Sequence, residues 1–574
     1  METNKNNMSK KVFLMTFFGL SLIINTGCND FLAENEIPRI TSDFYATKQG
    51  VIAAIDATYS YMRFGVGGEY SNIFTELGND LITGSEGALS YPSNIYSATM
   101  SPTLSGLYSL WGNHYKAIGV ANLVIDALPE ANMSENEKVG YSAEMCFFRA
   151  WYYFDLVQQF GRIPLIIKAV TTPSTEFKRA SVADIYKHII TDLRYSEENL
   201  RETATGVEKG KATRYAAAHL LAKVYLTRGS AVSDQRGQQA TDMDSAYYYS
   251  KKVIDSQRYS LLENFSDLWN INNMGNQEVI FSVQFTNDPI YNAPGNLSHL
   301  YWGSWYEDQP GMMRDLENGR PYRFHVATNK TMFELFDRKN DSRFYKSFKW
   351  VYIANRTATN MAVGDTAIYY SLNPPKDREY KYKYFQWDKE NIGNNNRYYP
   401  PVLKYFDPLR PSVNETQGIR EWVRMRLGET YLIAAEAAGR KGNYEEAAEL
   451  INVIRKRASW KDRETKMAQY WVEEGGEVEN TASTYEALVV TADDIHSNFA
   501  DFILDERGRE LLGEYMRWED LVRCEKLVEY VRKYNPDAAG NIKEHHKLRP
   551  IPQNHIDRIN PRGSADEEQN PGYF

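Results

Sequence analysis

The chain has 574 residues, 25% of them charged, and a formal net charge of −9 at pH 7. This length can bury a large core in one or several domains, and an acidic balance without a long basic run argues against a nucleic-acid partner. Aromatic residues make up 13% of the chain, and 41 of them are tyrosines, which suit sugars and polar interfaces as well as helix packing.

The first 27 residues predict an export signal that ends at a cysteine. An apolar run from Val12 to Ile24 follows two lysines and is too short to span a bilayer, and Gly27 then precedes Cys28. We expect Cys28 to be acylated and to become the new N-terminus. The alternative is a plain secretory signal that happens to contain a cysteine.

The beginning of the mature chain follows from this signal. Residues 28–42 are polar and predict a lipidated tether, and several acyl chains on one cysteine would anchor it firmly to a membrane. Met8 could be the true start as well as Met1.

Cys146 and Cys524 lie in apolar surroundings typical of buried thiols. A disulfide between these two cysteines is the alternative.

Helical spacing of apolar residues dominates the first part of the mature chain. The predicted helices span residues 43–62, 110–128, 143–160, 182–200, 213–228 and 244–256. Residues 65–105 are rich in glycine and serine and have no sustained period, which predicts a long loop with short helical pieces. Loops of this length inside a compact domain are commonly functional.

Residues 259–419 have a different pattern, with more glycine, proline, asparagine and aromatic residues. Residues 278–285 alternate in a way that predicts a strand, and residues 301–306 form a dense aromatic cluster in a predicted loop. Helices are expected to resume at Trp422 and to span 426–441, 444–457, 493–513 and 517–534. Glu514 and Arg517 are spaced for a neighbouring ion pair, which contributes only about a few tenths of a kcal/mol when it is exposed.

Two helix pairs have similar sequences, one beginning near Ala216 and one near Tyr431. Small residues on the first helix of each pair allow the second to approach closely, as in tetratricopeptide repeats. We therefore predict a mainly α fold: an interrupted tetratricopeptide-like helix-pair array with a loop-rich, partly irregular second region containing short strands. Residues 43–574 would form one domain, with the scaffold at about 43–258 and 420–574 and the irregular region at about 259–419.

Several short motifs, in a fixed order, resemble one family. They are Cys28-Asn29-Asp30-Phe31-Leu32, residues 143–150 leading to Phe160-Gly161-Arg162-Ile163-Pro164, Gly210-Lys211-Ala212-Thr213, residues 426–437, residues 451–458, Glu506-Arg507-Gly508-Arg509-Glu510, residues 517–523, Leu548-Arg549-Pro550 and Asn570-Pro571-Gly572-Tyr573. In this order the chain resembles the SusD/RagB-like outer-membrane nutrient-binding lipoproteins over nearly its whole mature length.

The resemblance implies a location and a partner. Members of that family sit on the outer face of the outer membrane, tied there by lipid, and cover a SusC-like TonB-dependent barrel transporter. It implies no catalysis. It also implies that loops of the two irregular regions contact the ligand, without a fixed motif to carry over.

The sequence itself contains no recognisable catalytic or metal-binding motif. It has no His-Glu-x-x-His and no Cys-x-x-Cys, and Asp493-Asp494 is better explained by the dipole of the helix that it begins. We expect no cofactor, while a metal ion that shapes the loops stays open. A lipid-anchored glycosidase is the remaining enzymatic alternative.

Sugar binding requires aromatic faces beside hydrogen-bonding side chains, and both predicted loops offer them. A pyranose ring has an apolar face that stacks on aromatic rings, and its hydroxyl groups need polar partners. The candidate ligand-binding residues are Asn79, Asp80, Tyr91, Tyr96, Trp302, Trp305 and Tyr306. The competing interpretation is that these rings pack inside the protein. We therefore predict oligosaccharide capture for a transporter, with a peptide or other nutrient as the alternative ligand.

Overall fold

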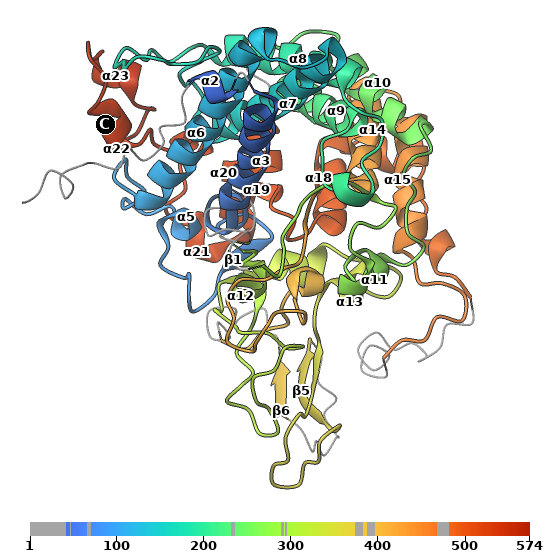
Figure 1. The fold of residues 1–574 in the computed structure, drawn as a ribbon. Coiled ribbons are helices and arrows are strands. Elements are labelled where there is room, and N and C mark those ends of the chain that lie inside the picture. Colours follow the sequence, from blue (N-terminus) through green and yellow to red (C-terminus); the bar gives the residue numbers. More distant parts are fainter. Residues whose placement is uncertain are drawn as a thin grey trace, which may run out of the picture.

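The computed structural model describes residues 42–45, 47–65, 71–230, 236–288, 292, 295–372, 383–386, 397–467 and 482–573. The predicted signal, Cys28 and the predicted tether up to residue 41 lie outside these residues. Figure 1 shows a layer of helices above a region of loops and short strands that narrows to a tip. Among the described residues, none of the helices combines the length and apolar character needed to cross a bilayer.

The first half of the helical scaffold consists of helices packed side by side in chain order. These are α2 (Ser42–Tyr45), α3 (Lys48–Gly65), α6 (Ser105–Ala127), α7 (Glu135–Phe160), α8 (Val182–Asn199), α9 (Arg214–Ser230) and α10 (Asp242–Asp255). Helix α7 begins with a capping box between Ser134 and Glu137 and ends at Gly161, where φ is 65°. Serine satisfies the first free N–H groups, and glycine tolerates this backbone conformation without strain.

The second half of the scaffold comes from the C-terminal part of the chain. Its helices are α14 (Leu427–Arg440), α15 (Tyr444–Ala458), α17 (Ala492–His496), α18 (Phe499–Glu510), α19 (Arg517–Arg523), α20 (Leu527–Tyr534), α21 (Pro536–Ala539), α22 (Gln553–Ile556) and α23 (Ala565–Glu568). Helix α14 packs against α10 and α9, so the two halves form one continuous layer. Within the second half, α14 also lies close to α18: a Cβ atom on Gly439 would lie 2.1 Å from the ring of Phe499.

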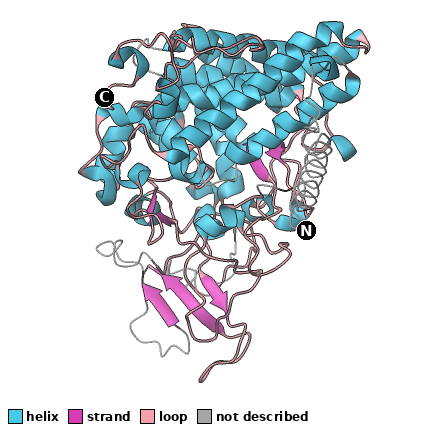
Figure 2. Cartoon of the chain, turned by 60° about the vertical axis from the view of Figure 1, so that its left-hand side comes forward, coloured by secondary structure: helices cyan, strands magenta, loops and turns pink. Residues whose placement is uncertain are grey.

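The loop-rich region contains short elements arranged in three small sheets. Strand β1 (Ile82–Gly84) pairs antiparallel with β3 (His325–Ala327), and β2 (Val279–Val283) with β7 (Trp422–Arg426). Strand β5 (Thr366–Ser371) pairs antiparallel with β4 (Val351–Ile353) and parallel with β6 (Lys383–Gln386). Figure 2 shows this three-stranded sheet away from the helices. Short helices α5 (Pro92–Ile95), α11 (Phe265–Leu268), α12 (Ser298–Trp302) and α13 (Arg343–Ser347) lie among the loops.

The mainly α fold with an irregular second region is confirmed, and so are the strand at 279–283 and the helix pair at 427–458. The expectation that helices resume at Trp422 is wrong. Residues 422–426 are a strand because they pair with β2, with Val283 opposite Trp422. Periodicity alone does not separate a short apolar strand from the start of a helix.

A buried network of ion pairs joins the loop-rich region to the scaffold. Arg343 of the loop-rich region binds Glu506 at 2.9 Å and Glu510 at 3.0 Å on α18. Arg426 binds Glu278, Glu510 and Glu514, the last at 2.8 Å. The expected ion pair between Glu514 and Arg517 is not formed: Glu514 is 1% exposed and binds Arg426 and Lys404, whereas Arg517 binds Asp80.

Candidate functional site

The two loops predicted to contact ligand lie against each other. Strands β1 and β3 pair, and the hydrogen bonds continue beyond them: the N–H of Ser85 donates to the carbonyl of Phe324 at 2.9 Å, and that of Gly87 to Arg323 at 2.8 Å. The N–H of Arg323 donates to the carbonyl of Gly303 at 3.1 Å. Segments about 240 residues apart in the chain therefore meet at one surface.

Trp305 is the centre of this surface. Its side chain is half-buried, and its backbone N–H donates to the carbonyl of Arg397 at 2.9 Å. The guanidinium carbon of Arg323 lies 4.1 Å from the indole centroid and that of Arg397 at 5.6 Å. Both cations share the carboxylate of Glu86, with nitrogen–oxygen distances of 3.2 and 2.8 Å. The hydrogen bond from Arg397 lowers the pKa of Glu86, so this carboxylate stays ionised.

Three tyrosines extend the surface around Trp305. Tyr91 is half-buried and packs edge-on against Phe324, with centroids 4.9 Å apart. Tyr322 is 44% exposed, and the hydroxyl of Tyr398 donates to Asp308 at 2.6 Å. We call the residues that share this surface the aromatic rim: Glu86, Tyr91, Trp305, Tyr322, Arg323, Arg397 and Tyr398. It combines flat rings with charged hydrogen-bonding groups of both signs.

Five of the seven predicted contact residues are buried, and their predicted role is corrected to packing. Trp302 is 1% exposed, and its indole N–H donates to the hydroxyl of Tyr515 at 2.9 Å. Tyr306 is fully buried and donates to the carbonyl of Gly319 at 2.6 Å. Tyr96 is 2% exposed and donates to the carbonyl of Gly78. None of these three rings has an exposed face for a ligand.

The two polar candidates are equally enclosed. Asp80 binds Arg517 at 2.6 Å and Lys330 at 2.9 Å. Burial opposes ionisation, but these two cations hold the pKa of Asp80 well below its usual range. Asn79 accepts hydrogen bonds from the N–H groups of Leu81 and Ile82, each at 2.8 Å. Both side chains fix the loop that leads into β1, and of the predicted residues only Tyr91 and Trp305 reach the rim.

Sequence reasoning missed Glu86, Tyr322, Arg323 and Arg397. Arg323 lies in the left-handed region, with φ of 57°, and no sequence pattern marks it. The pairing of β1 with β3 places residues 85–91 beside residues 320–324. A prediction of this strand pairing is therefore what could have identified these residues. A one-residue shift would have turned different side chains outward.

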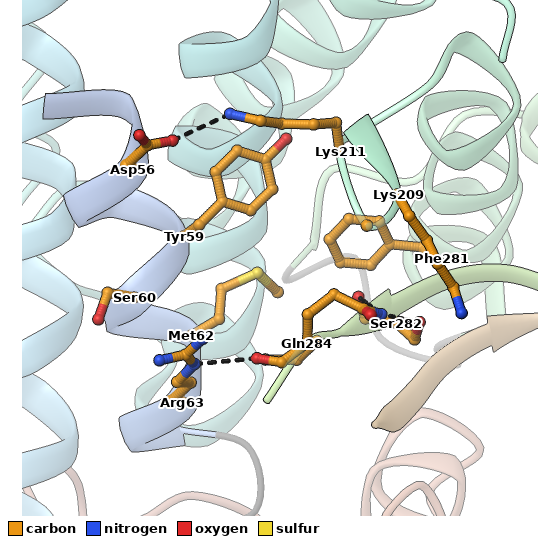
Figure 3. A pocket seen from close by; sticks show the side chains of 12 residues that line it. Asp56, Tyr59, Ser60, Met62, Arg63, Lys209, Lys211, Phe281, Ser282 and Gln284 are labelled. Atoms are coloured by element: carbon orange, nitrogen blue, oxygen red, sulfur yellow. Dashed lines mark hydrogen bonds and ion pairs between the residues drawn. The ribbon is translucent and has the colours of Figure 1, made fainter. Parts of the chain in front are cut away.

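A separate hollow of about 390 Å³ lies between α3, the loop before α9 and strand β2 (Figure 3). Lys211 binds Asp56 at 3.0 Å, and the Nε of Arg63 donates to the carbonyl of Gln284 at 2.9 Å. None of the predicted ligand-binding residues lines it.

No group of three histidine, cysteine or carboxylate side chains in the described part of the chain could hold a metal ion.

Comparison with family models gives two matches. Residues 233–573 match a model described as the SusD family, and residues 83–226 match one described as starch-binding and associating with the outer membrane. Two SusD-like proteins of Formosa agariphila are 23% and 25% identical, over 95% and 98% of this chain and 96% and 100% of their own lengths.

Solved structures agree on the fold. A laminarin-binding SusD-like protein has a TM-score of 0.64 at 22% identity, covering 92% of this chain and 100% of that one. A SusD homologue from Bacteroides thetaiotaomicron reaches 0.68 at 17% identity, covering 92% and 97%. Surface glycan-binding protein A from Bacteroides fluxus reaches 0.60 at 21% identity, covering 92% and 99%.

Proposed function

Because the chain belongs to the SusD family, we propose that it captures oligosaccharides at the aromatic rim and delivers them to a TonB-dependent outer-membrane transporter. Carbohydrate binding is supported by the described function of two structural neighbours, one binding laminarin and one a surface glycan-binding protein. Bond cleavage has no part in the proposal: the protein holds the glycan and releases it unchanged.

A single observation carries the choice of site: the half-exposed indole of Trp305 lies beside two guanidinium groups and a carboxylate. The indole offers a flat apolar face to the C–H groups of a sugar ring. Arg323 and Arg397 donate to sugar oxygens, and Glu86 accepts from hydroxyl groups. The exposed ring of Tyr322 provides a second stacking surface for a longer chain.

The proposal is tested by binding measurements on the mature protein against a glycan panel that includes laminarin oligosaccharides. Replacing Trp305 with Ala is expected to weaken binding roughly tenfold or more, because central aromatic contacts dominate such interfaces. Tyr248 is 58% exposed on α10, so Tyr248→Ala removes an exposed ring of the scaffold and serves as the matched control. If Trp305→Ala binds glycan as the parent does, the rim is not the site.

The same binding panel distinguishes oligosaccharides from peptides as the ligand. Peptides of two to ten residues are included, and capture of peptides with no glycan bound would replace oligosaccharide by peptide in the proposal. In either case the protein would still cover a transporter.

We further propose that Cys28 carries the lipid that holds the protein at the cell surface. The match to a model described as associating with the outer membrane supports this. Cys28→Ala is expected to release the protein from the membrane fraction without changing its affinity for glycan. Retention of Cys28→Ala in that fraction would contradict acylation at this residue.

A further inference from the structure

A second cavity lies within the helical scaffold, away from the elements that form the rim. It measures about 310 Å³ and is bounded by the end of α7, the start of α8, α9, α19 and the C-terminal segment. A larger hollow of about 680 Å³ shares part of its lining, including Arg236 and Leu548, and gives it a route to solvent. A water molecule occupies about 30 Å³ of liquid, so the cavity exceeds the needs of a few waters.

Among the described residues, neither Glu519 nor Tyr186 of the cavity lining has a hydrogen-bond partner for its side chain. Glu519 is 9% exposed, and no residue in the described part of the chain forms a hydrogen bond or ion pair with it. Tyr186 is 1% exposed; its ring packs edge-on against Phe154, and its hydroxyl has no hydrogen-bond partner among the described residues. Buried polar groups of folded proteins nearly always have partners, so a molecule in the cavity, whether water or a ligand, would bond with these two groups.

Burial raises the pKa of Glu519 to about 7. Lys223 on α9 and Arg424 on β7 favour its ionised form, while Asp155 on α7 and the neighbouring Asp520 oppose it. The carboxyl group is therefore divided between its neutral and ionised forms near neutral pH. A ligand that donates hydrogen bonds to the carboxylate would favour the ionised form.

The charges in the lining select the chemistry of that ligand. Arg236 and Arg523 also line the cavity. Arg523 is paired with Glu436 and Asp520, and Lys223 with Glu429, so Arg236 is the cation that makes the cavity unfavourable for an ammonium ion. The hydrogen-bond donors that Glu519 lacks therefore come best from neutral hydroxyl groups. Val157, Val522 and Leu548 provide an apolar wall, which suits the C–H groups of the same molecule.

We propose that this cavity is a binding site for a small neutral polyol, whose adjacent hydroxyl groups donate to Glu519 and bond with the hydroxyl of Tyr186. The site is independent of the aromatic rim and shares no residue with it. Its size admits a four- or five-carbon polyol or a single sugar unit.

The test uses saturation-transfer NMR of the mature protein with erythritol and D-xylose at pH 5.5 and pH 8.5. Because the ionised carboxylate is the better acceptor, binding is expected to be at least fivefold tighter at pH 8.5. Glu519→Gln is expected to weaken binding and to remove its pH dependence. Tyr186→Phe is expected to weaken binding while keeping the pH dependence.

Glu544→Gln is the matched control, because Glu544 is 72% exposed and lines only the outer hollow. Thermal unfolding of each variant checks that it is folded. The proposal is overturned if neither polyol binds at either pH, or if Glu519→Gln binds with the parent's affinity and pH profile. Trp305→Ala is expected to leave polyol binding unchanged. An experiment that contradicts the polyol site can therefore be distinguished from one that contradicts glycan binding at the rim.

Discussion

The scaffold and the loop-rich face use the same kinds of charged residue for opposite purposes. Arg426 is 1% exposed and holds three carboxylates between the two regions, whereas Arg397 is 46% exposed and holds one carboxylate beside a half-exposed indole. At Arg426 the ion pairs fix how the two regions pack together, whereas at Arg397 they leave donors and acceptors available to a ligand. Depth of burial, more than residue type, separates the two roles.

The largest expected effect is on the buried network. Arg426→Ala removes the guanidinium group that binds all three carboxylates, although Arg457 still binds Glu278 and Glu510, and Lys404 still binds Glu514. Breaking a buried pair in this way costs about 3–5 kcal/mol of unfolding free energy. Chemical denaturation followed by circular dichroism measures it. A loss below about 1 kcal/mol, as for a surface ion pair, would remove the distinction between the regions.

The next effect separates two tryptophans three residues apart. Trp302→Ala is expected to lower the unfolding free energy by about 3–5 kcal/mol, because it empties a closed site in the core. Trp305→Ala is expected to leave stability nearly unchanged and to weaken glycan binding. Denaturation and calorimetry on both variants decide the assignment, and similar stability losses for the two would place Trp305 in the core as well.

A smaller effect concerns Glu76, a buried carboxyl group that forms no ion pair with any cation of the described residues. Burial raises the pKa of Glu76 to about 8, although the N–H of Tyr515 donates to it at 3.0 Å. Since the unfolded group ionises near pH 4.5, folding holds a proton there, and stability is lost as the pH rises from about 4.5 to about 8. Glu76→Gln is expected to gain on the order of 1–2 kcal/mol at pH 8 and little at pH 4.5. Urea denaturation at both pH values checks this, and an equal change at both would show that Glu76 does not titrate.

The smallest expected effect is on the exposed pair. Arg397→Ala removes one partner of Glu86 and is expected to change the unfolding free energy by less than about 1 kcal/mol. Its effect on glycan affinity is expected to be measurable but smaller than that of Trp305→Ala. A stability loss as large as that of Arg426→Ala would show that the rim is a structural support.

The scaffold was predictable because its signals are local. The Ser134 cap, the Gly161 stop and the apolar periods lie within single helices or directly beside them. The rim depended on distant partners. Trp302 and Trp305 look alike in sequence, and what distinguishes them is the hydroxyl of Tyr515, which lies 213 residues further along the chain.

The pairing of Asp80 with Arg517 also ties the loop before β1 to α19. The buried carboxylate of Asp80 has both of its cations only when residue 517 is present. A chain truncated before α19 would therefore lack half of this buried network, and its loop before β1 is expected to be open to proteases.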